Sequence, residues 1–241
     1  LLYHLLWSIV DLIYPPYCAG CDKPGSRWCE ACENNVQILE THMCQTCGDL
    51  IEPGETLCER CQNEPPPVEM LRSWGVYQDP LRKAIHKFKF KNDLSLGETF
   101  SRYLLSLLEK NVWNIDLIIP VPLHAGHGQA RGYNQAAMLA FPLALAADVK
   151  YSAKALRWSK ETSSQVGLTL NERKANVKDA FIADSSIIMD KKVLIIDDIA
   201  TTGSTIFECA AACKNAGASA VYGLTLARAV YVREPERQEN K

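Results

Sequence analysis

The first 22 residues of this 241-residue chain contain no lysine or arginine. A secretory signal peptide starts with a basic region, so this absence argues against one. The apolar stretch at the start is too short to span a bilayer and is interrupted by Asp11, and no other segment reaches transmembrane length. We therefore expect a cytoplasmic protein without a transmembrane segment.

Two nucleotide-binding patterns are also missing. Neither G-x-G-x-x-G nor G-x4-G-K-[ST] occurs, so the sequence gives no support for a dinucleotide-binding or P-loop site. Residues 2–13 instead place their leucines and isoleucines on one helical face, which predicts a short helix packed on the protein's own core. A membrane-surface helix is the alternative, although the lysines and arginines that usually flank one are absent.

The net charge is small, but the charged residues are unevenly divided along the chain. The formal net charge is -2, yet residues 1–70 hold three basic and eleven acidic side chains, against 23 and 17 in residues 71–241. Such a split indicates two units with different surfaces. We place the boundary at the proline run 65–67, which gives an N-terminal helix and cysteine-rich unit at 1–66 and a second unit at 67–241.

Cysteines are the residues in excess, and eight of the ten fall between positions 18 and 61. They form four Cys-x-x-Cys pairs: Cys18, Cys21, Cys29, Cys32, Cys44, Cys47, Cys58 and Cys61. Two such pairs supply the four thiolates of a tetrahedral Zn²⁺ site, so the spacing predicts two structural zinc ions in a double zinc ribbon. The remaining Cys209 and Cys213 have helical spacing and are expected to be small buried residues.

Other interpretations of the cysteines remain open at this point. Thiolates also bind iron–sulfur clusters, and a disulfide scaffold would need an oxidising compartment. The pairs could close sequentially or interleave, and the short loops between adjacent pairs favour sequential closure.

The second unit alternates strand-like and helix-like patterns. Strands are expected at 73–77, 116–121, 193–196 and 220–227, and helices at 81–88, 96–108, 134–145 and 202–215, with a further short helix opening at 169–172. This alternation is typical of an α/β fold with a parallel sheet.

The most informative stretch follows the apolar strand at 193–196. Asp197 and Asp198 end that strand, and a loop of hydroxyls and one glycine leads into a helix. Ligands of parallel sheets bind at this end of the strands, and a helix N-terminus offers N–H groups to a phosphate. The carboxylates can accept hydrogen bonds from vicinal sugar hydroxyls, so the stretch predicts a sugar-phosphate site. The hydroxyl loop consists of Thr201, Thr202, Gly203, Ser204 and Thr205.

This combination resembles the phosphoribosyl pyrophosphate (PRPP) motif of type I phosphoribosyltransferases. Taken with the double zinc ribbon, the rest of the chain resembles the ComF/GntX family over nearly its whole length. The additional matching segments are Pro120-Val-Pro-Leu-His124, Arg131-Gly-Tyr-Asn-Gln135, Ser164-Gln165-x-Gly-Leu, Arg173-x-x-Asn176 and Ala180-Phe181. Members of this family are linked to DNA uptake and natural competence.

The resemblance implies a reaction and a set of roles. A phosphoribosyltransferase, which is a glycosyltransferase that moves a pentosyl group, would transfer ribose 5-phosphate from PRPP to an acceptor that the sequence does not identify. Asp197 and Asp198 would hold the ribose, the hydroxyl loop the 5-phosphate, and Mg²⁺ would neutralise the pyrophosphate. The pyrophosphate contacts would come from Val121, Pro122, Leu123, His124 and Arg131, and further candidates are Lys89, Asn134, Gln135 and Gln165.

Two plainer interpretations apply to this stretch. A pair of aspartates can be a solvated strand end, or the phosphoacceptor pair of a receiver-like domain, which usually lies on the first strand. The polar segment between Trp158 and Glu172 could be a lid over the site or a surface loop.

A rival hypothesis makes the protein a non-catalytic adaptor in transformation. Residues 82–91 hold five basic side chains and two phenylalanines, a composition that can follow single-stranded DNA or simply form the solvated face of an amphipathic helix. The acidic zinc ribbon would then contact DNA-uptake or recombination proteins.

Overall fold

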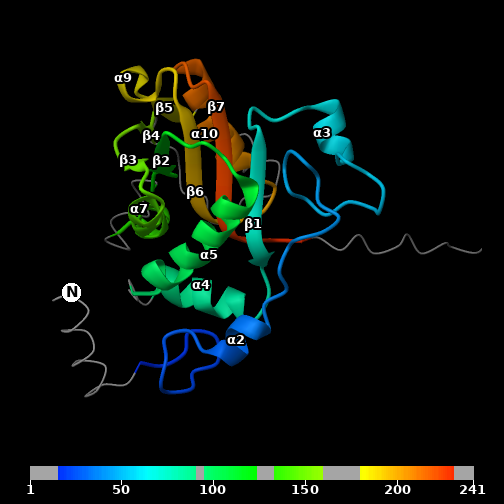
Figure 1. The fold of residues 1–241 in the computed structure, drawn as a ribbon, viewed down its shortest axis with the longest axis vertical. Helices are drawn as coiled ribbons and strands as arrows, with labels where there is room; N and C mark the ends of the chain where they lie inside the picture. Colours follow the sequence, from blue (N-terminus) through cyan, green and yellow to red (C-terminus); the bar gives the residue numbers. More distant parts are fainter. Residues whose placement is uncertain (1–15, 91–94, 124–132, 160–179, 231–241) are drawn as a thin grey trace, which may run out of the picture.

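The computed structural model describes residues 16–90, 95–123, 133–159 and 180–230. Its centre is a five-stranded sheet in the order β1-β7-β6-β2-β3, with every neighbouring pair parallel (Figure 1). The strands are β1 (Met70–Val76), β2 (Leu117–Pro120), β3 (Lys150–Tyr151), β6 (Lys192–Ala200) and β7 (Ala220–Arg228). The prediction of a parallel α/β sheet is confirmed.

Helices cover both faces of the sheet. The strands have apolar runs because both of their faces are buried, as parallel sheets require. Side chains of Ile118, Leu194 and Ile196 join one core cluster, and those of Leu117 and Ile195 join the other. The first cluster includes residues of α4 (Leu81–Phe90), α5 (Ser95–Asn111) and α7 (Gln135–Ala147), and the second includes residues of α10 (Ser204–Asn215).

A small antiparallel pair completes the second unit. It consists of β4 (Leu156–Trp158) and β5 (Phe181–Ala183), and the short helix α9 (Ser185–Ile188) follows it. Helices expected at 81–88, 96–108, 134–145 and 202–215 are all present. The expected helix at 2–13 and the helix opening at 169–172 lie outside the described residues.

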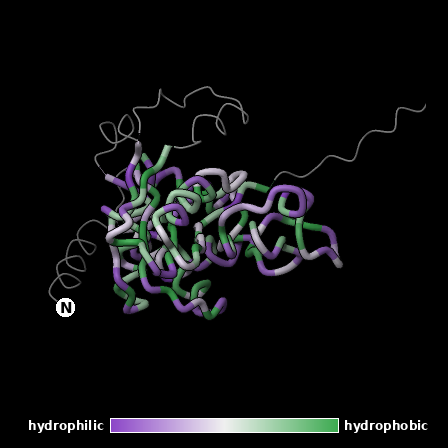
Figure 2. The backbone as a smooth tube through the Cα atoms, turned by 90° about the horizontal axis from the view of Figure 1, so that it is seen from above, coloured by the Kyte–Doolittle hydropathy of each residue, from purple (hydrophilic) through white to green (hydrophobic). Residues whose placement is uncertain are grey.

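The cysteine-rich unit forms two modules, each with one short helix. The first module, residues 17–36, contains α2 (Glu30–Asn34) and lies beside α4, and the second, residues 43–64, contains α3 (Glu59–Asn63) and lies beside β1 (Figure 1). Seen from above, the second module projects from one side of the body (Figure 2).

The chain between the two modules covers the outer edge of β1. The amide of Leu39 donates to the Trp74 carbonyl, and the Val76 amide donates to the Gln37 carbonyl. Further along the strand, the Leu71 amide donates to the carbonyl of Thr46 in the second module. An exposed strand edge is a template for unwanted pairing, so these bonds protect the sheet and fix the second module to it. In the part of the chain that the structure describes, no helix is both long and apolar enough to cross a bilayer.

Candidate functional site

The eight ribbon cysteines gather into two groups of four. Within each group all sulfur atoms lie within 4.8 Å of one another, and the groups are Cys18, Cys21, Cys29 and Cys32, then Cys44, Cys47, Cys58 and Cys61. The sulfur–sulfur distances of Cys18–Cys32, Cys21–Cys29 and Cys47–Cys58 are 3.6–3.7 Å. A tetrahedral zinc site with Zn–S bonds of ~2.3 Å has sulfur atoms about 3.8 Å apart, so both groups fit zinc. The pairs close sequentially, as the loop lengths favoured.

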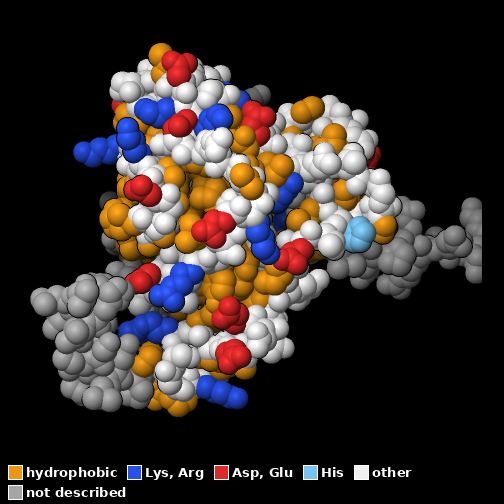
Figure 3. Space-filling view, viewed as in Figure 1, with side chains coloured by type: hydrophobic (Ala, Val, Ile, Leu, Met, Phe, Trp, Pro, Cys, Tyr) orange, Lys and Arg blue, Asp and Glu red, His pale blue; other side chains and the backbone are white. Residues whose placement is uncertain are grey.

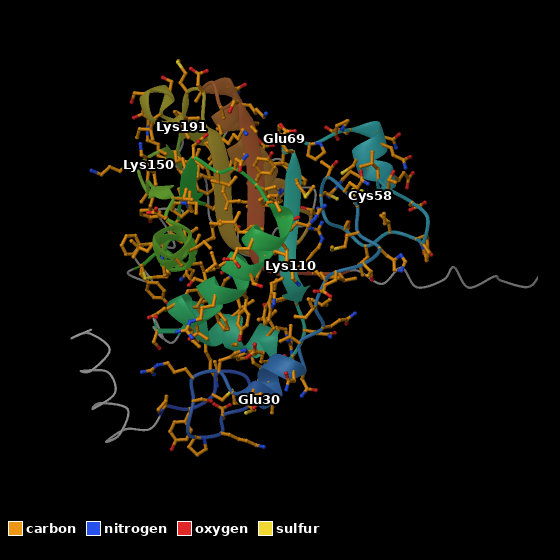
Figure 4. All side chains as sticks on the ribbon, in the orientation of Figure 1. Glu30, Cys58, Glu69, Lys110, Lys150 and Lys191 are labelled. Carbon is orange, nitrogen blue, oxygen red and sulfur yellow. The ribbon has the colours of Figure 1, made fainter. Side chains whose placement is uncertain are left out.

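The two zinc modules are packed into different parts of the molecule. In the first module, Trp28 makes an edge-to-face contact with Phe100 of α5, at 5.6 Å between ring centroids. In the second, Phe207 of α10 packs against the cysteine cluster. Figure 4 labels Glu30 in the first module and Cys58 in the second, at separate positions on the sheet domain. The ribbon therefore has two distinct contacts with the fold.

The proline loop, residues 121–124, and the acidic stretch meet at the carboxyl edge of the sheet. Pro120 of β2 lies opposite Ile196 of β6, and the Val121 amide donates to the Ile196 carbonyl at 2.9 Å. The parallel register thus places Val121 beside Asp197, although 76 positions separate them in the sequence. This juxtaposition is what a site at the ends of parallel strands requires.

The acidic pair lies within β6 rather than at its end. We expected the strand to end in the two aspartates, but it continues past them to Ala200 because β7 is long enough to pair with it, with Ala200 opposite Arg228. Successive strand residues point to opposite faces. The Ile195 side chain lies on the face of the sheet that α10 covers, and the Ile196 side chain lies on the face that α4 covers. By this alternation the Asp197 side chain is on the α10 face and the Asp198 side chain is on the α4 face.

Lys89 of α4 is the ionic partner of Asp198. Its Nζ lies 2.9 Å from Oδ2 of Asp198, and the two side chains are only 23% and 9% exposed. Burial lowers the pKa of Lys89, but the charges of Asp198 and Asp197 outweigh it, so that pKa stands above its usual value. Lys89 therefore remains protonated, and it lies beside the acidic pair.

Asp197 has a less favourable environment for its charge. Burial, followed by the neighbouring Asp198 carboxylate, raises the pKa of Asp197 to about 7, and Lys89 opposes the shift. Its Oδ1 accepts a hydrogen bond from the Asp198 amide at 2.9 Å. On the α10 face, burial and the charges of Cys213 and Asp197 raise the pKa of the Cys209 thiol. Cys209 and Cys213 are both fully buried in the core, as predicted.

The hydroxyl loop, residues 201–205, turns the chain from β6 into α10. Gly203 is the N-cap residue and has φ +80°, a left-handed conformation that glycine adopts without strain. The Ser204 amide, the first of α10, donates to Thr202 Oγ1 at 3.3 Å. Gly203 has no side chain with which to cap the next amides, those of Thr205 and Ile206, so these two can serve an anion. The Thr202 and Ser204 hydroxyls hydrogen-bond to each other at 2.6 Å. The loop therefore presents hydroxyls and amides at the start of a 12-residue helix.

Side chains from two other elements hold the proline loop. Asn134 donates from Nδ2 to the Val121 carbonyl at 2.9 Å, while its Oδ1 caps α7 by accepting from the Ala137 amide. The Trp158 ring nitrogen donates to the Pro122 carbonyl at 2.9 Å. Gln135 is buried, and its amide contacts the Lys89 carbonyl at 3.5 Å. Among the remaining candidates, Leu123 lies at the end of the described loop, and His124, Arg131 and Gln165 lie outside the described residues.

Two residues at this edge were not identified from the sequence. Trp158 was noted only as the start of a polar segment, and Arg60 was noted only for its charge. Arg60 donates from Nη1 to the carbonyl of Thr202 in the hydroxyl loop at 2.7 Å, across 142 positions of sequence. An isolated arginine between two zinc ligands has no periodicity that would indicate such a contact.

The basic stretch on α4 is largely used in ion pairs. Arg82 and Lys83 pair with Asp79, Lys87 pairs with Asp22 of the first module, and Lys89 pairs with Asp198. On the face shown in Figure 3, basic side chains are scattered among acidic ones. The helix buries Leu81, Ile85 and Phe88, so the amphipathic-helix interpretation accounts for it.

Comparison with known proteins agrees with this architecture. A double zinc ribbon domain matches residues 9–67, and a phosphoribosyl transferase domain matches residues 102–241. Competence protein F of Haemophilus influenzae is 31% identical over 221 residues, covering 88% of this chain and 90% of that protein.

Two further relatives extend the comparison. The DNA utilization protein YhgH of Escherichia coli K12 is 30% identical and covers 90% of this chain and 99% of that protein. Competence protein ComFC of Bacillus subtilis is 24% identical, with 86% of each chain covered. The chain therefore belongs to the ComF family, in which a double zinc ribbon is joined to a phosphoribosyltransferase domain.

Proposed function

We propose that the protein binds PRPP with Mg²⁺ at the carboxyl edge of the sheet and transfers ribose 5-phosphate to an acceptor. The observation that carries this proposal is the meeting of three groups at one edge. The hydroxyl loop opens α10, the two aspartates lie directly before it, and the proline loop lies beside them through the β2–β6 register. The phosphoribosyl transferase domain match supports the same assignment.

Each group suits one part of PRPP. The 5-phosphate is assigned to the hydroxyl loop, whose amides and helix dipole favour an anion. The ribose hydroxyls are assigned to the carboxylates of Asp197 and Asp198, which approach the edge from opposite faces of β6. The pyrophosphate is assigned to residues 121–124 and Arg131. Asn134 and Trp158 serve this part by fixing the carbonyls of Val121 and Pro122.

The transfer breaks the bond between C1′ of the ribose and the pyrophosphate oxygen. The bonding electrons leave with the pyrophosphate, and a lone pair of the acceptor forms the new bond to C1′. Positive charge develops on the ribose ring, and the carboxylates beneath it offset that charge. Bound Mg²⁺ would neutralise the departing pyrophosphate. Lys89 lies 2.9 Å from Asp198 and offsets the negative charge of its carboxylate beside the sugar site.

The relatives named for competence and DNA utilization support a place for this protein in DNA uptake or use. The acceptor is not identified by any group at the site. The alternative of a single-stranded-DNA track along α4 has little support, because Arg82, Lys83, Lys87 and Lys89 already have acidic partners.

Calorimetry with PRPP and Mg²⁺ tests the proposal. We expect binding by the parent protein and at least a tenfold weaker affinity, about 1.4 kcal/mol, for the variant Asp197→Asn plus Asp198→Asn. Asp184→Asn is the matched control, because that carboxylate caps α9 away from the site. Absence of PRPP binding by the zinc-loaded parent protein, or binding that the double variant leaves unchanged, would refute the proposal.

A further inference from the structure

The second zinc module is in direct contact with the hydroxyl loop. Arg60 lies on α3 between the ligands Cys58 and Cys61, so its backbone is part of the metal-binding turn. Its side chain leaves the module, donates to the Thr202 carbonyl at 2.7 Å and lies over the Phe207 ring, 5.5 Å from the centroid. One side chain thus joins a zinc turn to both the loop and the first turns of α10.

The other end of the Arg60 guanidinium faces the cysteine cluster. Its Nη2 is buried and has no nitrogen or oxygen partner within the described residues, and Cys47 is beside it. A zinc-bound thiolate is negatively charged and accepts N–H hydrogen bonds, so the Cys47 sulfur is the fitting acceptor. Hydrogen bonds from neighbouring groups to metal ligands orient those ligands, and the metal site in turn fixes the neighbouring groups. The guanidinium is therefore held from the zinc side as well as from the loop side.

The contact with Thr202 determines which way the next amide points. A trans peptide unit is planar, with its C=O and N–H on opposite sides. Since the Thr202 carbonyl points to Arg60, the Gly203 N–H points away from Arg60. Glycine can adopt either sign of φ, so a Thr-Gly peptide without an anchor can flip and turn this donor inward. The observed φ of +80° is the orientation that Arg60 holds.

We propose that Arg60 is a positioning residue that locks the 202–203 peptide and so makes the second zinc site the anchor of the phosphate-binding loop. This inference rests on the proposed function for the identity of the ligand, but the anchoring itself is a property of the free protein. It assigns the second zinc module a role in arranging the anion site, in addition to stabilising the ribbon.

Arg72 provides the matched comparison. This β1 residue also reaches the second module, donating to the carbonyls of Cys44 and Gln45, but within the described residues it makes no hydrogen bond to the hydroxyl loop. Removal of Arg72 therefore weakens the docking of the module without releasing the 202–203 peptide. If Arg60 acted only by holding the module in place, the two arginines would be equivalent.

The experiment compares Arg60→Met, Arg60→Lys and Arg72→Met in the full-length, zinc-loaded protein. Three quantities are measured: zinc content, hydrogen exchange of the amides at 201–206 without ligand, and affinity for PRPP with Mg²⁺. For Arg60→Met we expect unchanged zinc content, faster exchange in the loop and about tenfold weaker PRPP binding, since one charge-assisted hydrogen bond is lost. Arg60→Lys should recover part of both effects, and Arg72→Met should leave PRPP affinity within about twofold.

Several outcomes would overturn the inference. Unchanged loop exchange in Arg60→Met would do so, as would an equal loss of PRPP affinity in Arg60→Met and Arg72→Met. If Arg60→Met loses zinc, the Arg60→Lys variant is used in its place. A zinc-loaded Arg60→Lys variant whose loop amides exchange at the same rate as those of Arg72→Met also counts against the inference. A parent protein that fails to bind PRPP refutes the proposed function, and the exchange measurement still decides the anchoring.

Discussion

The Lys89 ammonium lies 2.9 Å from the Asp198 carboxylate and ties α4 to the acidic stretch of β6. Both side chains are largely removed from water. Removing one partner of such a pair leaves an uncompensated buried charge, which costs far more than breaking a surface pair. The pair therefore contributes to the stability of the α4 packing as well as to the charge state of the site.

Asp198→Asn is expected to lower the free energy of unfolding by about 3 kcal/mol, because Lys89 loses its counter-ion. The double variant with Lys89→Met should recover part of this loss. Denaturant unfolding measures both. The control is Glu40→Gln, which breaks the exposed pair with Lys110 and should cost less than about 1 kcal/mol. Equal costs for Asp198→Asn and Glu40→Gln would contradict the buried-pair interpretation.

Asp197→Asn is expected to have the opposite effect on stability. The pKa of Asp197 is raised to about 7 in the folded protein, so between about pH 4 and pH 7 the folded state holds a proton that the unfolded state has lost. Stability attributable to this group therefore falls as the pH rises through that interval. Thermal unfolding should show the Asn variant more stable than the parent at pH 8, and similar to it at pH 5.

Asp184→Asn gives a useful contrast in the same measurement. Hydrogen bonds from Ser186 lower the pKa of Asp184, so its contribution is present above its ordinary pKa and is lost as the pH falls. The variant should therefore be less stable than the parent at neutral pH. If the stability difference between the parent and Asp197→Asn does not grow as the pH rises, burial does not raise the pKa of Asp197.

Gly203→Ala is expected to destabilise the protein and weaken PRPP binding. An added Cβ would lie 2.8 Å from Phe207 Cζ and 3.2 Å from Leu71 Cδ2, at a φ of +80°. Gly54→Ala is the control: Gly54 has φ +97° but no atom within 4 Å of the added Cβ. The control should lower the free energy of unfolding by about 1 kcal/mol through backbone strain alone, and Gly203→Ala should lower it by at least about 1 kcal/mol more. Denaturant unfolding and calorimetry give the two readouts, and equal effects would argue against close packing at the loop.

The two zinc ions are expected to leave at different rates. Cys21 in the first site is exposed, whereas Phe207 covers the second. Metal analysis should give about two zinc per chain, and release to a coloured chelator should occur in a fast and a slow phase. Cys21→Ser should remove the fast phase and Cys58→Ser the slow one. Release of both ions in a single phase from the parent would contradict the difference in burial.

Local patterns in the sequence were sufficient for the elements and the ligand sets. The spacing of the Cys-x-x-Cys pairs identified the eight ligands and favoured sequential closure, and the two groups of four sulfur atoms in the structure confirm that pairing. Apolar runs such as 193–196 indicate strands buried on both faces, and helical periodicity located α4, α5 and α7. The predicted end of this strand, at Asp197 and Asp198, was too early because pairing with β7, a non-local interaction, carries β6 to Ala200.

The relationships across the site were decided by tertiary structure. Periodicity describes neighbours along the chain, and it cannot place Arg60 against Thr202 or Trp158 against Pro122, because those contacts depend on strand register and module docking. The same holds for Lys89, which is identical in type to its neighbours on α4 but alone reaches Asp198. The sequence by itself determined the zinc ligands, the parallel α/β class and the acidic-hydroxyl motif. Only the packed sheet decided that the two aspartates face different helices, and that a zinc turn holds the loop beside them.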